Sequence, residues 1–216
     1  MSNHSKQQFH PLLLISALRQ ESSVILMQYQ HSKEKTPQGY ILFRFQKREI
    51  FLLEIGSGKG IDRSKLKSAI VQINPGFIVN FGICGALTHR VKLNKNYLAR
   101  SISYDNESEI DLSHDLNLLN SLFNSQSVLQ SVRLLTVRDP VLDSIKRDEL
   151  LQITACELVD MEAYFVAQTA RELKIPITIL KQVTDYSDQR ALQQIKQNKK
   201  IWQESLQQGL SGILNL

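Results

Sequence analysis

Two acidic side chains stand where a carboxyl group could act on a substrate. Asp185 follows the apolar run 175–180, so it is predicted at the end of a buried strand. Burial raises the pKa of a carboxyl group, which would let Asp185 hold a proton near neutral pH and donate it. Glu162 offers two acceptor oxygens, which suits a pair of neighbouring hydroxyls. The alternatives are structural: Asp185 could cap the next turn, and Glu162 could begin a helix, favourably placed against its dipole.

Short apolar runs alternate with segments of helical periodicity around these residues. Strands are predicted at residues 11–17, 77–81, 133–137 and 175–180, and a hairpin at 40–45 and 50–55. Helices are predicted at 61–73, 141–151, 157–173 and 189–216. Residues 82–86 are interpreted as a small-residue bend, and the acid-rich stretch 104–115 as a solvated loop.

This alternation favours an α/β fold. We predict a three-layer α/β/α sandwich with a central mixed, largely parallel sheet and a site at the carboxyl ends of its strands. The length of 216 residues suits one domain, expected over residues 11–216, after a flexible N-terminus at residues 1–10.

Two motifs at a particular spacing carry a family resemblance. The segment Val159-Asp160-Met161-Glu162 resembles the V-[DE]-M-E pattern of the purine nucleoside phosphorylase/nucleosidase superfamily, and Thr184-Asp185 resembles its [ST]-D pair. Residues 15–21, 56–59 and 81–86 resemble the first strand with its acidic turn, the G-x-G-K turn and the glycine loop of that superfamily. The resemblance covers roughly residues 12–190, and is greatest to the methylthioadenosine/S-adenosylhomocysteine nucleosidases and the hopanoid-associated phosphorylase branch.

The resemblance implies cleavage of the N-glycosidic bond of a purine nucleoside, with adenine as the expected base. Asp185 would protonate the departing base at N7, Glu162 would bind the ribose hydroxyls, and Met161 would pack on the sugar, although a methionine there also suits a plain core. Glu21 stands where nucleosidases have the carboxylate that activates water; the alternative is a surface residue. Gly82, Ile83 and Val141 complete the implied substrate-binding set.

Hydrolysis and phosphorolysis make different demands on this set. A phosphate dianion needs arginines and hydroxyl or N–H donors, whereas Asn80 and Ile83 stand where phosphorylases of this type have Arg and Ser. Arg19 could still meet an anion. We therefore expect hydrolysis, with phosphorolysis, including of an adenosylhopane-type substrate, and nucleoside binding without turnover as alternatives. Base identity stays open, because Asp139-Pro140-Val141 replaces an expected aromatic residue, and so does the 5′ group.

Composition and charge pattern narrow the classes of molecule that the protein is expected to bind. Net charge is +5, but Lys and Arg are interspersed with Asp and Glu, which argues against nucleic-acid binding. No apolar run approaches the length of a membrane span, and the five histidines are dispersed, so neither membrane, metal nor cofactor is expected. Cys84 and Cys156 fit free thiols in the cytoplasm. The resemblance implies a homodimer or a higher oligomer.

Overall fold

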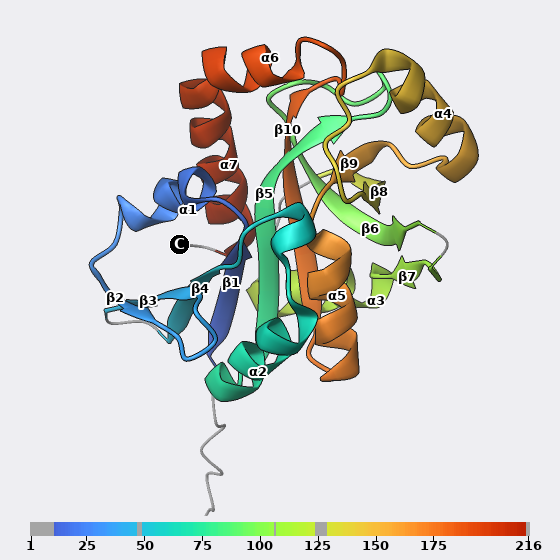
Figure 1. Cartoon of the computed structure of the whole chain (residues 1–216). Coiled ribbons are helices and arrows are strands. Elements are labelled where there is room, and N and C mark those ends of the chain that lie inside the picture. The colour runs from blue at the N-terminus through green and yellow to red at the C-terminus, as the bar shows by residue number, and fades with distance from the viewer. Residues whose placement is uncertain (1–10, 47–48, 106, 124–128, 215–216) are drawn as a thin grey trace, which may run out of the picture.

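A computed structural model describes residues 11–46, 49–105, 107–123 and 129–214, arranged as one mixed sheet with helices on both faces (Figure 1). The predicted flexible N-terminus, residues 1–10, lies outside this range. In chain order the strands are β1 (Leu12–Ser16), β2 (His31–Lys35), β3 (Ile41–Phe45), β4 (Ile50–Glu54), β5 (Phe77–Ala86), β6 (Asn96–Tyr104), β7 (Ile110–Asp111), β8 (Ser131–Thr136), β9 (Leu158–Asp160) and β10 (Ile177–Asp185). The helices are α1 (Arg19–Leu26), the 3₁₀ turn η1 (Gly58–Gly60), α2 (Arg63–Ile73), α3 (Ser113–Phe123), α4 (Ser144–Thr154), α5 (Ala163–Glu172), α6 (Ala191–Gln197) and α7 (Lys199–Leu214).

The predicted α/β class and its mixed sheet are confirmed. The strand order is β10-β6-β8-β9-β5-β1-β4-β3-β2, and β5 pairs with β10 as well, so five of these strands close into a ring. β1 runs parallel to β4 and to β5, and β5 runs parallel to β10. β3 and β4 form the predicted antiparallel hairpin. Parallel strands leave their carboxyl ends at one edge, where loops can form a site.

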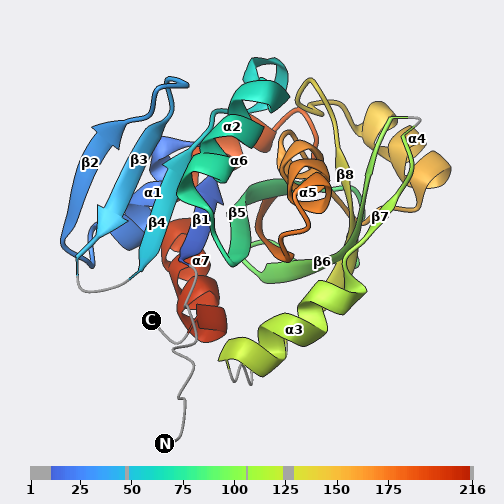
Figure 2. The same cartoon turned by 90° about the horizontal axis from the view of Figure 1, so that it is seen from below.

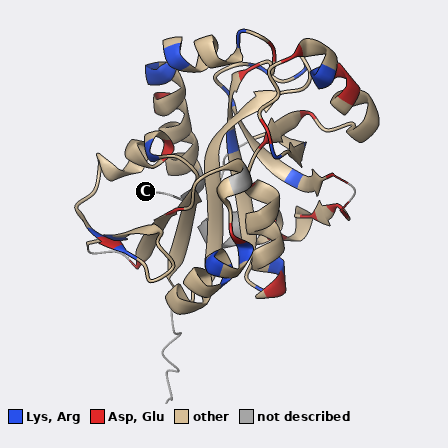
Figure 3. Ribbon diagram, in the orientation of Figure 1, with Lys and Arg blue, Asp and Glu red and all other residues tan. Residues whose placement is uncertain are grey.

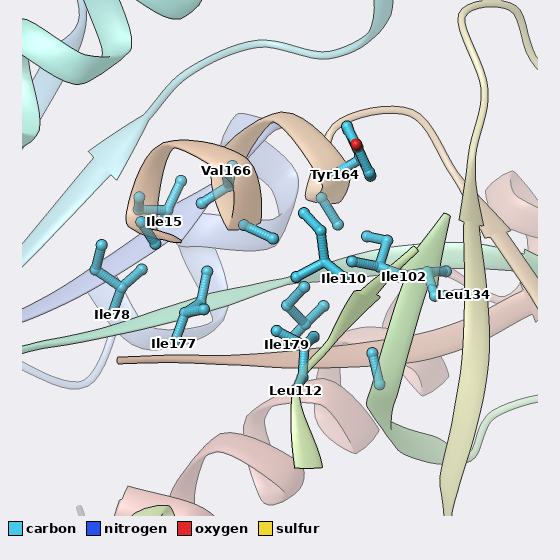
Figure 4. Packing of buried hydrophobic residues seen from close by; sticks show 14 of the residues in the cluster. Ile15, Ile78, Ile102, Ile110, Leu112, Leu134, Tyr164, Val166, Ile177 and Ile179 are labelled. Atoms are coloured by element: carbon cyan, nitrogen blue, oxygen red, sulfur yellow. The ribbon is translucent and has the colours of Figure 1, made fainter. Parts of the chain in front are cut away.

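Alternation along the buried strands produces the layers. Leu13 and Ile15 of β1 pack with α2 and α5, whereas Leu14 packs with α1 and α7 on the opposite face. Figure 2 shows α2 and α5 on one side of the sheet and α7 on the other. In Figure 4, Val166 of α5 lies among isoleucines of the strands beneath it. The central strands are thus covered on both faces, which explains their nearly uninterrupted apolar sequences.

Several predicted boundaries were wrong. β5 continues through Ala86, because its backbone at 82–85 pairs with β10, so the small residues form a strand rather than a bend. The predicted helix 157–173 is β9 followed by α5, since residues 158–160 pair with β8. The helix predicted at 141–151 starts at Ser144, because Asp143 caps its first turn, accepting from the N–H groups of Ile145 and Lys146.

Two longer stretches also differ from prediction. The expected C-terminal helix is divided at Asn198 into α6 and α7. The acid-rich stretch 104–115 is more than a solvated loop, because it contains β7 and the start of α3, with Ile110 and Leu112 buried. The sequence patterns did not predict α1, β2, β6 or α3.

Candidate active site

A pocket opens at the carboxyl ends of the central strands. Its walls come from the turn after β1, the last residues of β5, β9 and β10, the segment before α4, and α6. The lining residues include Leu18, Glu21, Ser57, Ile83, Gly85, Pro140, Val141, Leu142, Asp160, Met161, Glu162, Asp185, Ser187, Leu192 and Ile195. The pocket thus lies at the edge of the sheet where the site was predicted.

Glu21 is held in a gap in the sheet. β1 pairs with β5 only as far as Asn80, so the N–H of Ile83 has no strand partner on that side. Glu21, in the first turn of α1, turns back and accepts from Ile83 N at 2.8 Å and from the N–H groups of Ala17 and Leu18 at 3.0 and 2.8 Å. Its side chain is buried, which raises its pKa, while Lys181 and the three N–H donors act in the opposite direction.

Gly82 makes this arrangement possible. A Cβ built on Gly82 would lie 2.5 Å from Glu21 Oε1, closer than real contacts allow. Any larger residue at this position of β5 would therefore push the carboxylate out of the gap. Gly82 contributes by leaving room for Glu21 and is not itself among the residues lining the pocket.

A buried cation links the next two carboxylates. Lys181 of β10 donates to Glu162 Oε1, and its Nζ lies 2.8 Å from Asp160 Oδ2. Asp160 also accepts from Thr136 Oγ1 at 2.6 Å and from Ala163 N at 3.0 Å, which fixes the start of α5. All the members of this network are buried, so each charge depends on its partners.

The network shifts the pKa values of its members. Burial raises the pKa of Glu162 to about 8; the ammonium of Lys181 opposes this, and the carboxylates of Asp160 and Glu21 add to it. Burial disfavours the charge of Lys181, but the surrounding carboxylates outweigh that effect and raise its pKa. Lys181 therefore stays charged, and Glu162 is the member whose proton is most easily exchanged near neutral pH.

Asp185 ends β10 inside the pocket. It accepts a hydrogen bond from Thr184 Oγ1 at 2.8 Å and another from the backbone N–H of Ser187 at 2.9 Å. Burial raises its pKa, although both hydrogen bonds favour the ionised form. The carboxyl group is thus both oriented and able to hold a proton at higher pH than a free aspartate.

The structure brings together most of the residues singled out in the sequence. Glu21, Met161, Glu162 and Asp185 all line the pocket, as do Ile83 and Val141. Arg19 does not: its guanidinium binds Glu54 at 2.9 Å and lies over the ring of Phe43. The η1 turn supports the site from behind, because Gly58 N donates to the carbonyl of Met161 at 3.0 Å.

Sequence reasoning missed Asp160, Lys181, Ser187 and the apolar contribution of α6. A lysine inside an otherwise buried strand was the available signal for Lys181, since such a charge needs partners. The position of Leu192 and Ile195 in the pocket wall could not be predicted, because the sequence did not predict the division between α6 and α7.

The acidic and basic side chains that line the pocket all carry carboxyl groups, and Lys181 lies behind two of them. The lining, all of it within the described residues, contains Glu21, Asp160, Glu162 and Asp185 but neither Arg nor Lys. Along the rest of the chain, by contrast, Lys and Arg are interspersed with Asp and Glu (Figure 3). Among the described residues no group of His, Cys, Asp and Glu is placed to hold a metal ion.

Comparison with known proteins identifies the family of this chain. The sequence profile of the phosphorylase superfamily matches residues 12–215. The chain belongs to the phosphorylase superfamily. A search of curated protein sequences finds no match.

Solved structures of this superfamily share the fold. A 5′-methylthioadenosine/S-adenosylhomocysteine nucleosidase of Helicobacter pylori superposes with a TM-score of 0.85 at 18% identity, covering 97% of this chain and 99% of that one. Futalosine hydrolase of the same organism gives 0.82 at 16% identity, covering 96% and 98%. S-adenosylhomocysteine nucleosidase of Streptococcus pyogenes gives 0.83 at 16%, covering 98% and 99%. At these identities the likeness establishes the fold.

No helix in the described part of the chain is both long and apolar enough to cross a membrane.

Proposed function

We propose that this phosphorylase-superfamily protein hydrolyses the N-glycosidic bond of a purine nucleoside and releases the free base. The observation that carries the proposal is the composition of the pocket, whose lining, within the described residues, has four carboxyl groups and no Arg or Lys. A phosphate dianion would find no cationic side chain to bind there, whereas an ionised carboxylate would stabilise a sugar that becomes positively charged as its bond to the base breaks.

Asp185 is the general acid of this proposal. Its raised pKa lets it carry a proton that it delivers to N7 of the departing purine, so the base leaves as a neutral molecule. The hydrogen bonds from Thr184 and Ser187 hold the carboxyl group in one orientation during this transfer.

Glu162 and Met161 hold the ribose. Lys181 engages Oε1 of Glu162, which leaves its second oxygen to accept from the vicinal hydroxyls, and those donors favour its ionised form. Met161, fixed through the η1 turn, packs on the apolar face of the sugar.

Glu21 activates the water. Its two oxygens are held by three backbone N–H groups, so the side chain is placed before any substrate binds. A water on the pocket side of this carboxylate could lose its proton to Glu21 as it attacks the anomeric carbon. Ile83 beside it presents an alkyl side chain, which gives phosphate no hydroxyl donor.

Phosphorolysis is the less favoured alternative because Arg19, the cation nearest in sequence to Glu21, is bound to Glu54 outside the lining.

The apolar side chains of Leu18, Leu192 and Ile195 favour an uncharged 5′ substituent. The nucleosidases of similar fold are named for 5′-methylthioadenosine and S-adenosylhomocysteine, and we propose a 5′-modified adenosine here. We place the enzyme in the cytoplasm, where Cys84 and Cys156 stay reduced.

Base release with and without phosphate tests this function. The substrates are adenosine, 5′-methylthioadenosine, S-adenosylhomocysteine and 5′-alkyl adenosines, with products separated by chromatography. We expect free base and free sugar at the same rate in both buffers. Sugar 1-phosphate formed only when phosphate is present would establish the phosphorylase, and saturable binding without release would establish a binding protein.

A further inference from the structure

Ser187 has a hydroxyl that the positioning of Asp185 does not require. The hydrogen bond to Asp185 Oδ1 comes from the backbone N–H of Ser187, which nearly any residue could supply. Ser187 is buried, lines the pocket and has φ of +51°, a left-handed conformation that side-chain-bearing residues adopt at a cost. Because the bond to Asp185 uses the backbone N–H, it does not occupy the hydroxyl of this pocket-lining residue.

Gly85 shows where this hydroxyl lies. A Cβ built on Gly85 would overlap Ser187 Oγ and would come within 3.1 Å of Asp185 Oδ1. The hydroxyl and the carboxyl oxygen therefore both lie over the bare backbone of β5 at Gly85. Gly85 leaves the room that both polar groups occupy.

Purine chemistry gives this pair a common target. N7 and the substituent on C6 lie next to each other on one edge of a purine, the edge that proteins read in adenine and guanine. If Asp185 delivers its proton to N7, the base can be oriented with its C6 substituent toward the Ser187 hydroxyl. A serine hydroxyl both donates and accepts, so it can bond to a 6-oxo group or to a 6-amino group.

We propose that Ser187 is a specificity-determining residue whose hydroxyl binds the C6 substituent of the purine, so that the site accepts both 6-amino and 6-oxo bases. This inference rests on the proposed function, because it takes the position of the base from the proton transfer to N7. It predicts a broader choice of base than an adenine-only pocket would have.

Three substrates that differ only at C6 test the proposal: the 5′-methylthio derivatives of adenosine, inosine and purine riboside, the last with hydrogen at C6. The unaltered chain should cleave the first two with kcat/KM values within about tenfold of each other. Removing the hydroxyl in Ser187→Ala should lower kcat/KM for both of them by about three- to tenfold more than for purine riboside, the effect of one neutral hydrogen bond.

Ser187→Gly is the matched control, because it also removes the hydroxyl but relieves the left-handed backbone. The same selective loss in both variants would support the proposal. Equal losses on all three substrates, a selective loss in only one variant, or an unaltered chain that rejects the 6-oxo substrate would overturn it.

Calorimetric binding of adenine, hypoxanthine and purine separates this inference from the proposed function. If no riboside is cleaved, the hydrolase proposal fails; selective weakening of adenine and hypoxanthine binding in both variants would still support the role of Ser187. Equal weakening for all three bases, or no binding of any base to the unaltered chain, would overturn it.

Discussion

Glu162 lines the pocket and has a shifted pKa, and this shift has a consequence for stability. The folded protein keeps a proton on Glu162 up to about pH 8, whereas the unfolded chain loses it near 4.5. The contribution of Glu162 to stability is therefore full below about pH 4.5 and is lost as pH rises toward 8. Asp185 and Glu21 are shifted in the same direction.

The variant Glu162→Gln tests this linkage, because an amide does not titrate in this range. We expect the free energy of unfolding of Glu162→Gln to fall less steeply between pH 5 and 8 than that of the unaltered protein. Denaturant unfolding of both proteins at several pH values provides the comparison. Parallel curves would show that Glu162 titrates normally in the folded state.

The sequence predicted single residues that could do chemistry better than it predicted the contacts between them. Asp185, Glu162 and Glu21 were identified from motifs and do line one pocket. Lys181, the cation that bonds to Glu162, was not identified, because its role depends on the spatial closeness of residues 160, 162 and 181. A strand pattern shows that Lys181 is buried but not which carboxylates surround it.

At the scale of elements, the site depends on where β1 stops pairing with β5. Beyond Asn80 the edge of β5 is open to Glu21, and α1 begins close enough to fill it. Sequence patterns predicted both strands but not α1, whose apolar residues are confined to its last turn. β9 was hidden for a similar reason: three residues directly before a helix are too few to show alternation.

Gly82→Ala tests the importance of this gap. The added methyl group overlaps Glu21, so we expect a loss of about 1–3 kcal/mol in stability and at least a tenfold loss of kcat/KM. Gly60→Ala is the matched control, since a Cβ there meets nothing within 4 Å, and it should stay within about 0.5 kcal/mol of the parent. Thermal unfolding and steady-state rates measure both effects. Equal behaviour of the two variants would contradict the account.

The connection between α6 and α7 also bears on the pocket. Trp202 of α7 is buried and donates from its indole N–H to the carbonyl of Ile195 at 3.0 Å. This bond fixes the bend between the helices and holds Ile195 in the pocket wall. The apolar spacing of residues 189–216 predicted helix throughout, because periodicity does not reveal a one-residue interruption at Asn198.

For the whole molecule, the alternation of strands and helices was sufficient to predict the α/β class and the edge of the sheet where the pocket opens. The closure of the sheet was not predictable, since it requires β6 to lie between β8 and β10, and β6 mixes polar and apolar residues without a clear period. Long-range pairing of this kind leaves little local trace in a sequence.

The predicted homodimer is a property of the whole molecule that solution measurements can test. Large apolar side chains such as Leu18, Ile145 and Leu192 are exposed on or near the pocket side, where a second copy could cover them. Light scattering should give about twice the chain mass of 24.7 kDa. A mass of one chain over the working concentration range would contradict a dimer.

Burial at the end of β10 raises the pKa of Asp185, and we propose that this makes it the proton donor. The most direct measurement is the pH dependence of kcat/KM for 5′-methylthioadenosine with the unaltered protein and with Asp185→Asn, checking by thermal unfolding that both are folded. We expect the activity of the unaltered protein to fall as pH rises through the raised pKa of Asp185, and Asp185→Asn to lose about 10²- to 10⁴-fold in kcat/KM. Turnover by Asp185→Asn at the rate of the unaltered protein would contradict the account, because an amide has no proton to give.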